Sequence, residues 1–158
     1  RDPHTQKGTG MSKIVLITGG NRGLGRATAV KLLEAGFEVV YTYRDNPGEK
    51  IDAVALPLTV GDLESYDAFA VELRAVLRDR FGREDFDVLI NNAGVELGST
   101  IAEATVADFD RMMDVHLRGM VFLTQKVLPL IADGGKIVKA EAKTVGIMPP
   151  PMKPWRAR

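Results

Sequence analysis

Short apolar runs alternate with longer amphipathic stretches along most of the chain. The runs at 14–17, 39–43, 53–58, 88–90 and 136–138 contain β-branched residues and are long enough to form strands. The first run is apolar without interruption, which is typical of a strand buried on both faces of a parallel sheet. We therefore expect five strands.

Three segments between these runs carry apolar residues at the spacing of one helix face. They cover residues 24–35, 63–81 and 105–128. The third begins at Thr105, and Asp108 completes a capping pattern in its first turn. Strands that alternate with helices predict an α/β fold, a doubly wound parallel sheet of the Rossmann-like type.

The chain divides into three parts by its pattern. Residues 1–10 are polar and directly precede Met11, so we interpret them as a leading tag-like segment, with a functional arm as the alternative. Residues 11–138 carry the strand and helix pattern and form one predicted domain. Residues 139–158 lose the pattern and are rich in proline and basic residues, which predicts an irregular tail.

Composition narrows the class of protein. Lys plus Arg and Asp plus Glu each total 21, so no overall positive charge would attract nucleic acid. The chain has no cysteine, which excludes thiolate nucleophiles and cysteine-ligated zinc, and we expect no metal site. No apolar run is long enough to span a membrane, and we expect a cytoplasmic protein.

A glycine-rich turn separates the first predicted strand from the first predicted helix. Residues 18–25 read Thr-Gly-Gly-Asn-Arg-Gly-Leu-Gly. In such a turn, Gly19, Gly23 and Gly25 divide three tasks: a tight turn, close backbone approach to a pyrophosphate, and close packing of helix on strand. The following helix presents free N–H groups to the phosphates. The motif predicts a dinucleotide site, and an ordinary turn is the alternative.

This turn, followed by Asn-Asn-Ala-Gly at residues 91–94, resembles the short-chain dehydrogenase/reductase family over residues 13–138. The resemblance implies an NADP(H)-dependent oxidoreductase that interconverts a carbonyl and an alcohol on a small molecule. It also implies that Asn91 steadies the sheet, and that Ala93 and Gly94 lie along the nicotinamide ribose. For Asn92 the alternative is a purely structural role, in which its side chain closes a turn.

The motif and the resemblance together give one set of candidate cofactor-binding residues. They are Gly19, Asn21, Arg22, Gly23, Leu24, Gly25, Arg44, Thr59, Val60, Asn91, Ala93 and Gly94. Arg22 and Arg44 match positions where family members that prefer NADP carry basic residues. Asp45 favours the alternative, NAD(H), because a carboxylate there could bind the ribose 2′-hydroxyl.

Two departures from the family affect binding and proton transfer. Thr59 stands where the family has an aspartate that faces the adenine, so the backbone of Thr59 or Val60 would have to serve. His116 stands at the family's asparagine in the long helix, where that asparagine holds a water of a proton relay. We expect a packed or hydrogen-bonded histidine, and a catalytic relay is the alternative.

The third departure concerns the catalytic residues themselves. The family uses a Tyr-x-x-x-Lys pair and a serine after the fifth strand. The residues four positions after Tyr41, Tyr43 and Tyr66 are not lysine, and no serine follows the run at 136–138. We therefore expect the chain, as it stands, to be inactive and to lack the family's C-terminal strands and helices.

Three explanations for this loss of pattern stay open. The chain could be truncated or frame-shifted, residues could be missing or wrongly assigned after Val138, or a half-domain could have its own role. The first two make the parent protein an NADP(H)-dependent oxidoreductase. The third makes the chain a non-catalytic NADP(H)-binding module or pseudoenzyme. Because the missing half would leave apolar side chains of residues 109–122 uncovered, we expect a homo-oligomer.

Overall fold

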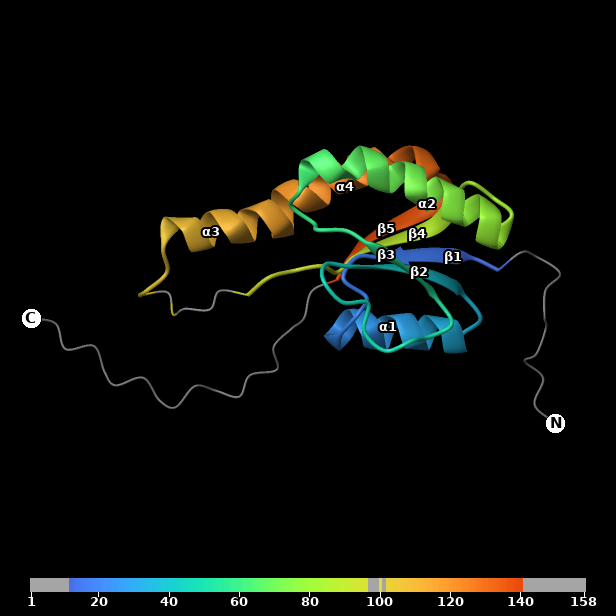
Figure 1. Cartoon of the computed structure of the whole chain (residues 1–158), viewed down its shortest axis with the longest axis horizontal. Helices are drawn as coiled ribbons and strands as arrows, with labels where there is room; N and C mark the ends of the chain where they lie inside the picture. The colour runs from blue at the N-terminus through green and yellow to red at the C-terminus, as the bar shows by residue number, and fades with distance from the viewer. Residues whose placement is uncertain (1–11, 97–99, 101, 141–158) are drawn as a thin grey trace, which may run out of the picture.

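The computed structural model describes residues 12–96, 100 and 102–140, and Figure 1 shows their arrangement. Five parallel strands form one sheet in the order β3-β2-β1-β4-β5. The strands are β1 Ile14–Ile17, β2 Glu38–Tyr43, β3 Val54–Pro57, β4 Phe86–Asn91 and β5 Ile131–Lys139. The predicted doubly wound parallel sheet is confirmed.

Helices cover both faces of this sheet. The α-helices of the described residues are α1 Gly23–Glu34, α2 Tyr66–Phe81, α3 Val106–Met113 and α4 Met120–Val127, with short 3₁₀ turns at Leu63–Ser65 and Leu128–Leu130. In Figure 1, α1 lies on one side of the strands, and α2 and α4 lie on the other. As expected, no helix joins β2 to β3.

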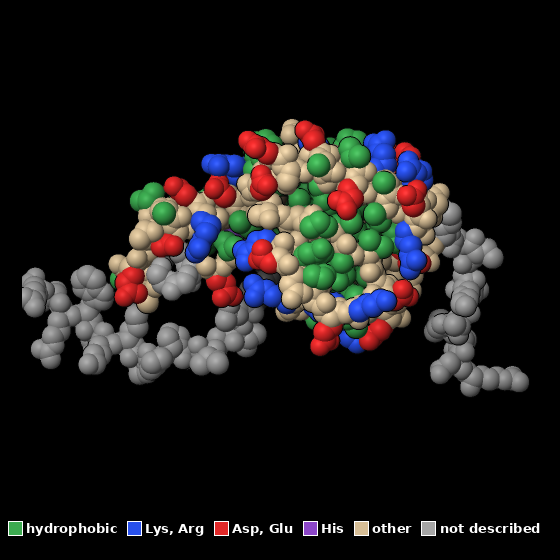
Figure 2. Space-filling model, in the orientation of Figure 1, with side chains coloured by type: hydrophobic (Ala, Val, Ile, Leu, Met, Phe, Trp, Pro, Cys, Tyr) green, Lys and Arg blue, Asp and Glu red, His purple; other side chains and the backbone are tan. Residues whose placement is uncertain are grey.

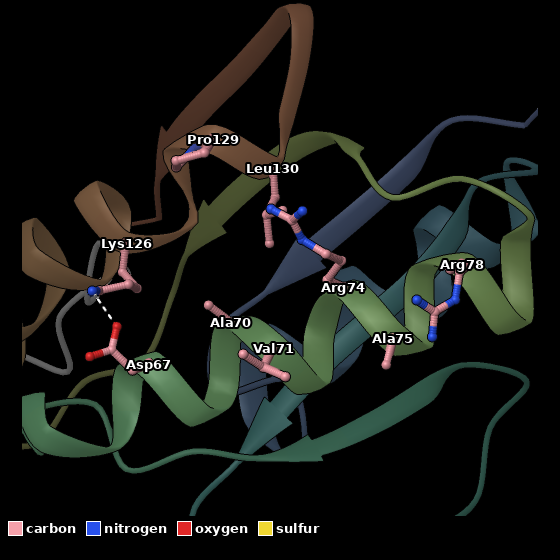
Figure 3. Close-up of a pocket in the computed structure, with 9 residues that line it drawn as sticks. All are labelled: Asp67, Ala70, Val71, Arg74, Ala75, Arg78, Lys126, Pro129 and Leu130. Atoms are coloured by element: carbon pink, nitrogen blue, oxygen red, sulfur yellow. Dashed lines mark hydrogen bonds and ion pairs between the residues drawn. The ribbon is translucent and has the colours of Figure 1, made fainter.

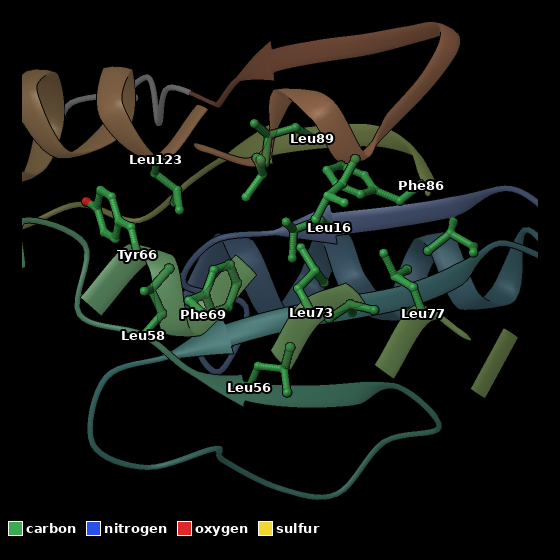
Figure 4. Close-up of a cluster of buried hydrophobic side chains, with 14 of the residues drawn as sticks. Leu16, Leu56, Leu58, Tyr66, Phe69, Leu73, Leu77, Phe86, Leu89 and Leu123 are labelled. Carbon is green, nitrogen blue, oxygen red and sulfur yellow. The ribbon is translucent and has the colours of Figure 1, made fainter. Parts of the chain in front are cut away.

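The core has two parts, one on each face of the sheet. The larger part lies between the sheet and helices α2 and α4, and Figure 4 shows its side chains, which include Leu16, Leu73 and Leu123. The smaller part lies under α1 and includes Val15 and Ala29. Because β1 sends alternate side chains into the two parts, its sequence is apolar at every position.

The two edge strands differ from each other. Pro57 lies in β3, which pairs only with β2, so its predicted place at the sheet edge is confirmed. At the other edge, β5 is longer than the predicted 136–138 and includes a register shift opposite Phe86 and Val88. From Asp133 to Lys139 every residue of β5 is exposed.

The helix predicted over 105–128 is helical at every position from Val106 to Val127, but it is not a single regular α-helix. Thr105 and Asp108 form the predicted capping box, but a π-helical segment, Asp114–Gly119, separates α3 from α4. At Gly119 this segment lies close to the loop after β3, since a Cβ there would lie 2.7 Å from the backbone N of Gly61. The wider π turn lets the helix approach the loop after β3 at that glycine.

The apolar side chains of α3 are uncovered, as expected for residues 109–122. None of its residues is buried, and the Phe109 side chain is 59% exposed. In Figure 1, α3 extends away from the sheet, so nothing in the described ranges covers its apolar side.

The surface carries charges of both signs. Figure 2 shows Lys and Arg side chains interspersed with Asp and Glu side chains on the face in view, in keeping with the equal totals of 21. No helix within the described ranges has both the length and the apolar character needed to cross a membrane.

A buried tyrosine joins α2 to the π-helical segment. The Tyr66 hydroxyl accepts a hydrogen bond from the Gly61 backbone N at 3.1 Å and donates one to the Gly119 carbonyl at 3.1 Å. Burial raises the pKa of this hydroxyl. Tyr66 therefore holds together the loop after β3 and the helix that packs on it.

Replacing Tyr66 with Phe should lower the free energy of unfolding by about 1–3 kcal/mol, because two backbone groups lose a largely buried partner. Urea unfolding measures the change. Tyr43→Phe is the matched control: the Tyr43 hydroxyl makes no hydrogen bond to the residues described, so its change should stay within about 0.5 kcal/mol. Equal losses in the two variants would contradict a special role for Tyr66.

Candidate functional site

A cleft of about 1430 Å³ opens at the carboxyl ends of the parallel strands. This edge is where open α/β sheets bind their ligands. Loops after β1, β2, β3 and β4 contribute to its walls, together with the start of the π-helical segment and the end of β5. The lining residues are 19, 21–25, 42–46, 58–61, 92–96, 111, 114–116 and 139–140.

All the predicted cofactor-binding residues except Asn91 line this cleft. Asn91 does not line the cleft, and its place in the cofactor site stays a prediction. Its side chain is buried, and its Nδ2 donates to Thr124 Oγ1 at 3.3 Å on the side of α4. Asn91 joins the sheet to a helix, which agrees with a role in steadying the sheet.

The ends of β1 and β4 are joined by a compact set of hydrogen bonds. Thr18 Oγ1 accepts from the backbone N of Asn92 at 2.9 Å and from that of Ala93 at 3.0 Å. In return, Asn92 Nδ2 donates to the carbonyl oxygens of Thr18 and Gly19, both at 3.0 Å. Asn92 thus does more than close its own turn: it ties together the two loops that form the cleft floor.

Sequence reasoning missed two threonines that shape the glycine turn. Thr18 and Thr42 are both at most 2% exposed, and Thr42 Oγ1 accepts from the Gly19 backbone N at 3.1 Å. A threonine at the end of a buried strand is the signal that could have identified them, since a buried hydroxyl needs partners.

The three glycines of the turn differ in their surroundings. Gly19 and Gly23 have φ angles of 67° and 55°, a region that favours glycine. A Cβ on Gly25 would lie 2.3 Å from the Gly19 carbonyl oxygen and 2.4 Å from Asn92 Nδ2, whereas a Cβ on Gly23 would meet nothing within 4 Å. Gly25 therefore permits close packing inside the protein, and Gly23 faces open space.

The N-terminus of α1 lies at the cleft without a side-chain cap. Arg22 occupies the cap position, no side chain accepts from the first turn, and that turn contains no acidic residue. The first N–H groups and the helix dipole therefore favour an anion at this point. Arg44, also on the cleft wall, forms an exposed ion pair of 2.6 Å with Asp45.

His116 lines the cleft next to the loop after β4. Its Nε2 lies 3.1 Å from the backbone N of Val95 and 2.6 Å from the Val95 carbonyl oxygen. The expected hydrogen-bonded histidine is confirmed, and the catalytic relay stays a prediction. Lys139, the last residue of β5, and Ala140 line the cleft where the family resemblance implies serine.

The described residues contain no group of three or more His, Cys, Asp or Glu that could hold a metal ion. They do contain a second hollow, a groove of about 530 Å³ between α2 and the end of α4. Figure 3 shows its walls, where Lys126 pairs with Asp67 and Arg74 lies nearby. None of its lining residues comes from the loops at the carboxyl ends of the strands.

Comparisons with known proteins agree with this geometry. The family model of short chain dehydrogenases matches residues 13–153. Versicolorin reductase 1 from Aspergillus parasiticus is 32% identical over 84% of this chain and 52% of its own length. Levodione reductase from Leifsonia aquatica is 33% identical over 85% of this chain and 53% of its own length. The chain thus spans about half the length of these relatives.

Solved structures give the same result. The landomycin C-6 ketoreductase LanV, solved with NADP and rabelomycin, superposes with a TM-score of 0.71 and 34% identity, over 80% of this chain and 56% of that one. A short-chain dehydrogenase from Streptomyces avermitilis gives 0.68 and 30%, over 81% of this chain and 48% of its own. The chain described here belongs to the short-chain dehydrogenase/reductase family.

Proposed function

We propose that the chain binds NADP(H) in this cleft and forms the cofactor-binding part of an oxidoreductase that interconverts a carbonyl and an alcohol on a small molecule. The observation that carries the proposal is the uncapped N-terminus of α1, which faces open space at Gly23. A dinucleotide pyrophosphate fits such a site, because it accepts hydrogen bonds from backbone N–H groups and interacts favourably with the dipole.

The cleft lining supports an orientation for the dinucleotide. Arg22 and Arg44 lie on the walls beside the glycine turn and β2, so we assign the adenosine end to them, with the backbone of Thr59 and Val60 beside the adenine. We assign the nicotinamide end to the Ala93–Gly94 backbone after β4. A bound nicotinamide would supply the hydride chemistry. The residues of this chain would hold it at that end of the cleft.

The preference for NADP(H) over NAD(H) rests on charge. A 2′-phosphate needs cations, and Arg22 and Arg44 supply two. LanV and a Burkholderia cenocepacia short-chain dehydrogenase, both similar to this chain, were solved with NADP. Asp45 competes with the phosphate for Arg44, since the two side chains are paired at 2.6 Å, and this pair limits the size of the preference.

A second candidate is a non-catalytic NADP(H)-binding module. It is favoured because the sequence lacks the tyrosine–lysine pair that acts as general acid in the family. No tyrosine in the sequence is followed four residues later by lysine, and Lys139 and Ala140 stand at the end of β5 in place of serine. Both candidates share the cofactor site. They differ in whether further residues complete the active site.

We also propose that the chain self-associates through the apolar surface of the α3–α4 region. Phe109, Leu117, Val121 and Phe122 are each at least 43% exposed there. Large apolar side chains exposed in one region of the surface are typical of an interaction surface.

Isothermal titration calorimetry should show tighter binding of NADPH than of NADH, by about three- to tenfold, because charge-assisted contacts to exposed arginines are partly screened by solvent. Arg44→Asp should reverse the order. Asp45→Asn should increase the preference for NADPH, since it removes the competing carboxylate. Equal dissociation constants for both cofactors in the unmodified protein would contradict the assignment.

The variants Gly23→Ala and Gly25→Ala separate binding from folding. Gly23→Ala should cost about 1 kcal/mol of unfolding free energy through its positive φ and weaken NADPH binding at least tenfold, because the methyl group would project into open space beside the proposed pyrophosphate site. Gly25→Ala should cost several times more stability, since its Cβ meets backbone and the Asn92 amide. Urea unfolding and NADPH titration measure both effects. A larger loss of stability in Gly23→Ala would show that Gly23 is chiefly structural.

The chain on its own should not oxidise NADPH in the presence of ketones or aldehydes. An alkoxide left by hydride transfer needs a proton, and loss of a general acid alone lowers the rate by about 10²–10⁴-fold. The measurement is NADPH absorbance with a panel of carbonyl compounds, using protein with a measured mass of 17.2 kDa. Turnover within the usual range of roughly 1–10³ s⁻¹ would contradict the prediction.

A further inference from the structure

The connection between β2 and β3 passes close to the glycine turn. This β2–β3 loop covers residues 44–53 and contains no helix, and its residues 44–46 line the cleft. Gly48 has a φ angle of 79°, and a Cβ there would lie 2.5 Å from the Asn21 carbonyl oxygen. Glycine at position 48 therefore lets the loop lie directly against the glycine turn.

Two side chains from outside the loop hold it by its backbone. Asn21 Nδ2 donates to the Asn46 carbonyl oxygen at 2.9 Å. The hydroxyl of Tyr41, a residue only 3% exposed, donates to the Pro47 carbonyl oxygen at 3.0 Å. Within the loop, Asn46 Oδ1 accepts from the Gly48 backbone N at 2.8 Å and closes a turn. The Asn46–Gly48 turn is thus fixed in itself and attached to the residues beneath it.

The hydrogen bond from Asn21 joins the two backbone segments that carry the arginines of the cleft wall. Arg22 directly follows Asn21, and Arg44 lies two residues before Asn46. The bonded residues are 25 positions apart, so no local structure sets the spacing of the two arginines. A loop released from Asn21 would have to be ordered when a ligand binds, and this ordering would lower the affinity.

We propose that Asn21 is a positioning residue: it holds the Asn46–Gly48 turn against the glycine turn, so that Arg22 and Arg44 can both bind one 2′-phosphate. The proposal rests on the proposed cofactor site. In this role the Asn21 amide acts through the loop and does not itself recognise the cofactor. Because NADPH and NADH differ only in the 2′-phosphate, the loss of Asn21 should affect the binding of NADPH and spare that of NADH.

Calorimetric titration of Asn21→Ala with both cofactors is the first measurement. The dissociation constant of NADPH should rise about three- to tenfold, and that of NADH should change less than about twofold, so that the preference for NADPH is lost. A side chain that contacts the adenosine or the pyrophosphate would behave differently, because both cofactors contain these groups and both would bind more weakly.

Gly48→Ala breaks the same contact from the side of the loop. Gly48 does not line the cleft, and its new Cβ would displace the Asn46–Gly48 turn from the Asn21 carbonyl. This variant should also lose the preference for NADPH. The double variant should be no worse than the weaker single variant, because both changes remove one interaction. Lys50→Ala is the matched control, since this exposed side chain belongs to the same loop but not to the cleft wall, and it should keep the preference.

NMR backbone order parameters of the protein without cofactor are the second measurement. They should fall at residues 46–48 in Asn21→Ala, since the released turn moves faster than nanoseconds. They should stay unchanged in Lys50→Ala. Urea unfolding of each variant shows whether it is folded, and Asn21→Ala keeps the test open if Gly48→Ala does not fold.

The proposal is overturned if Asn21→Ala weakens both cofactors equally or changes neither, if the losses in the double variant add, or if residues 46–48 keep their order without Asn21. These outcomes leave the proposed function standing, because the unmodified protein still binds NADPH. Failure of the unmodified protein to bind either cofactor would overturn the proposed function together with the assigned role of Asn21.

Discussion

The hydrogen bonds that join the end of β1 to the end of β4 determine the geometry of the cleft. Thr18 receives the first two N–H groups after β4, and the Asn92 amide returns to the glycine turn. With both loops fixed, Gly25 must be a glycine, because the Gly19 carbonyl and the Asn92 amide occupy the space of any side chain. That packing brings the uncapped N-terminus of α1 to the carboxyl edge of the sheet, where an anion is favoured.

A second set of contacts connects the long helical region to this cleft. Gly119 approaches Gly61 closely, the Tyr66 hydroxyl bridges the two, and the π turn between α3 and α4 accommodates the approach. The same π-helical segment carries His116 to Val95. The six residues Asp114–Gly119 therefore link two sets of contacts. One is the packing of Gly119 on Gly61, and the other is the hydrogen bonding of His116 to Val95.

Local pattern was enough to predict the sheet, its flanking helices and most of the cleft. The glycine turn follows a buried strand and opens a helix, so its place at the sheet edge follows from sequence. Other features depend on residues far apart along the chain, so no local sequence periodicity predicts them. They are the π turn, the partners of Thr18 and the inward position of Asn91. The exposure of Phe109 on α3 agrees with the expectation that the apolar side chains of residues 109–122 lie uncovered, because apolar spacing alone does not supply a surface to pack against.

The central claim is that the described part of the chain binds a nicotinamide dinucleotide at the loops after β1 and β4. Amide chemical shifts, followed by NMR as NADPH is added, test it most directly. We expect the largest changes at residues 19–25 and 92–95 and no change in the groove along α2 at residues 67–78. Unchanged loop resonances at saturating NADPH, or changes centred on that groove, would contradict the account.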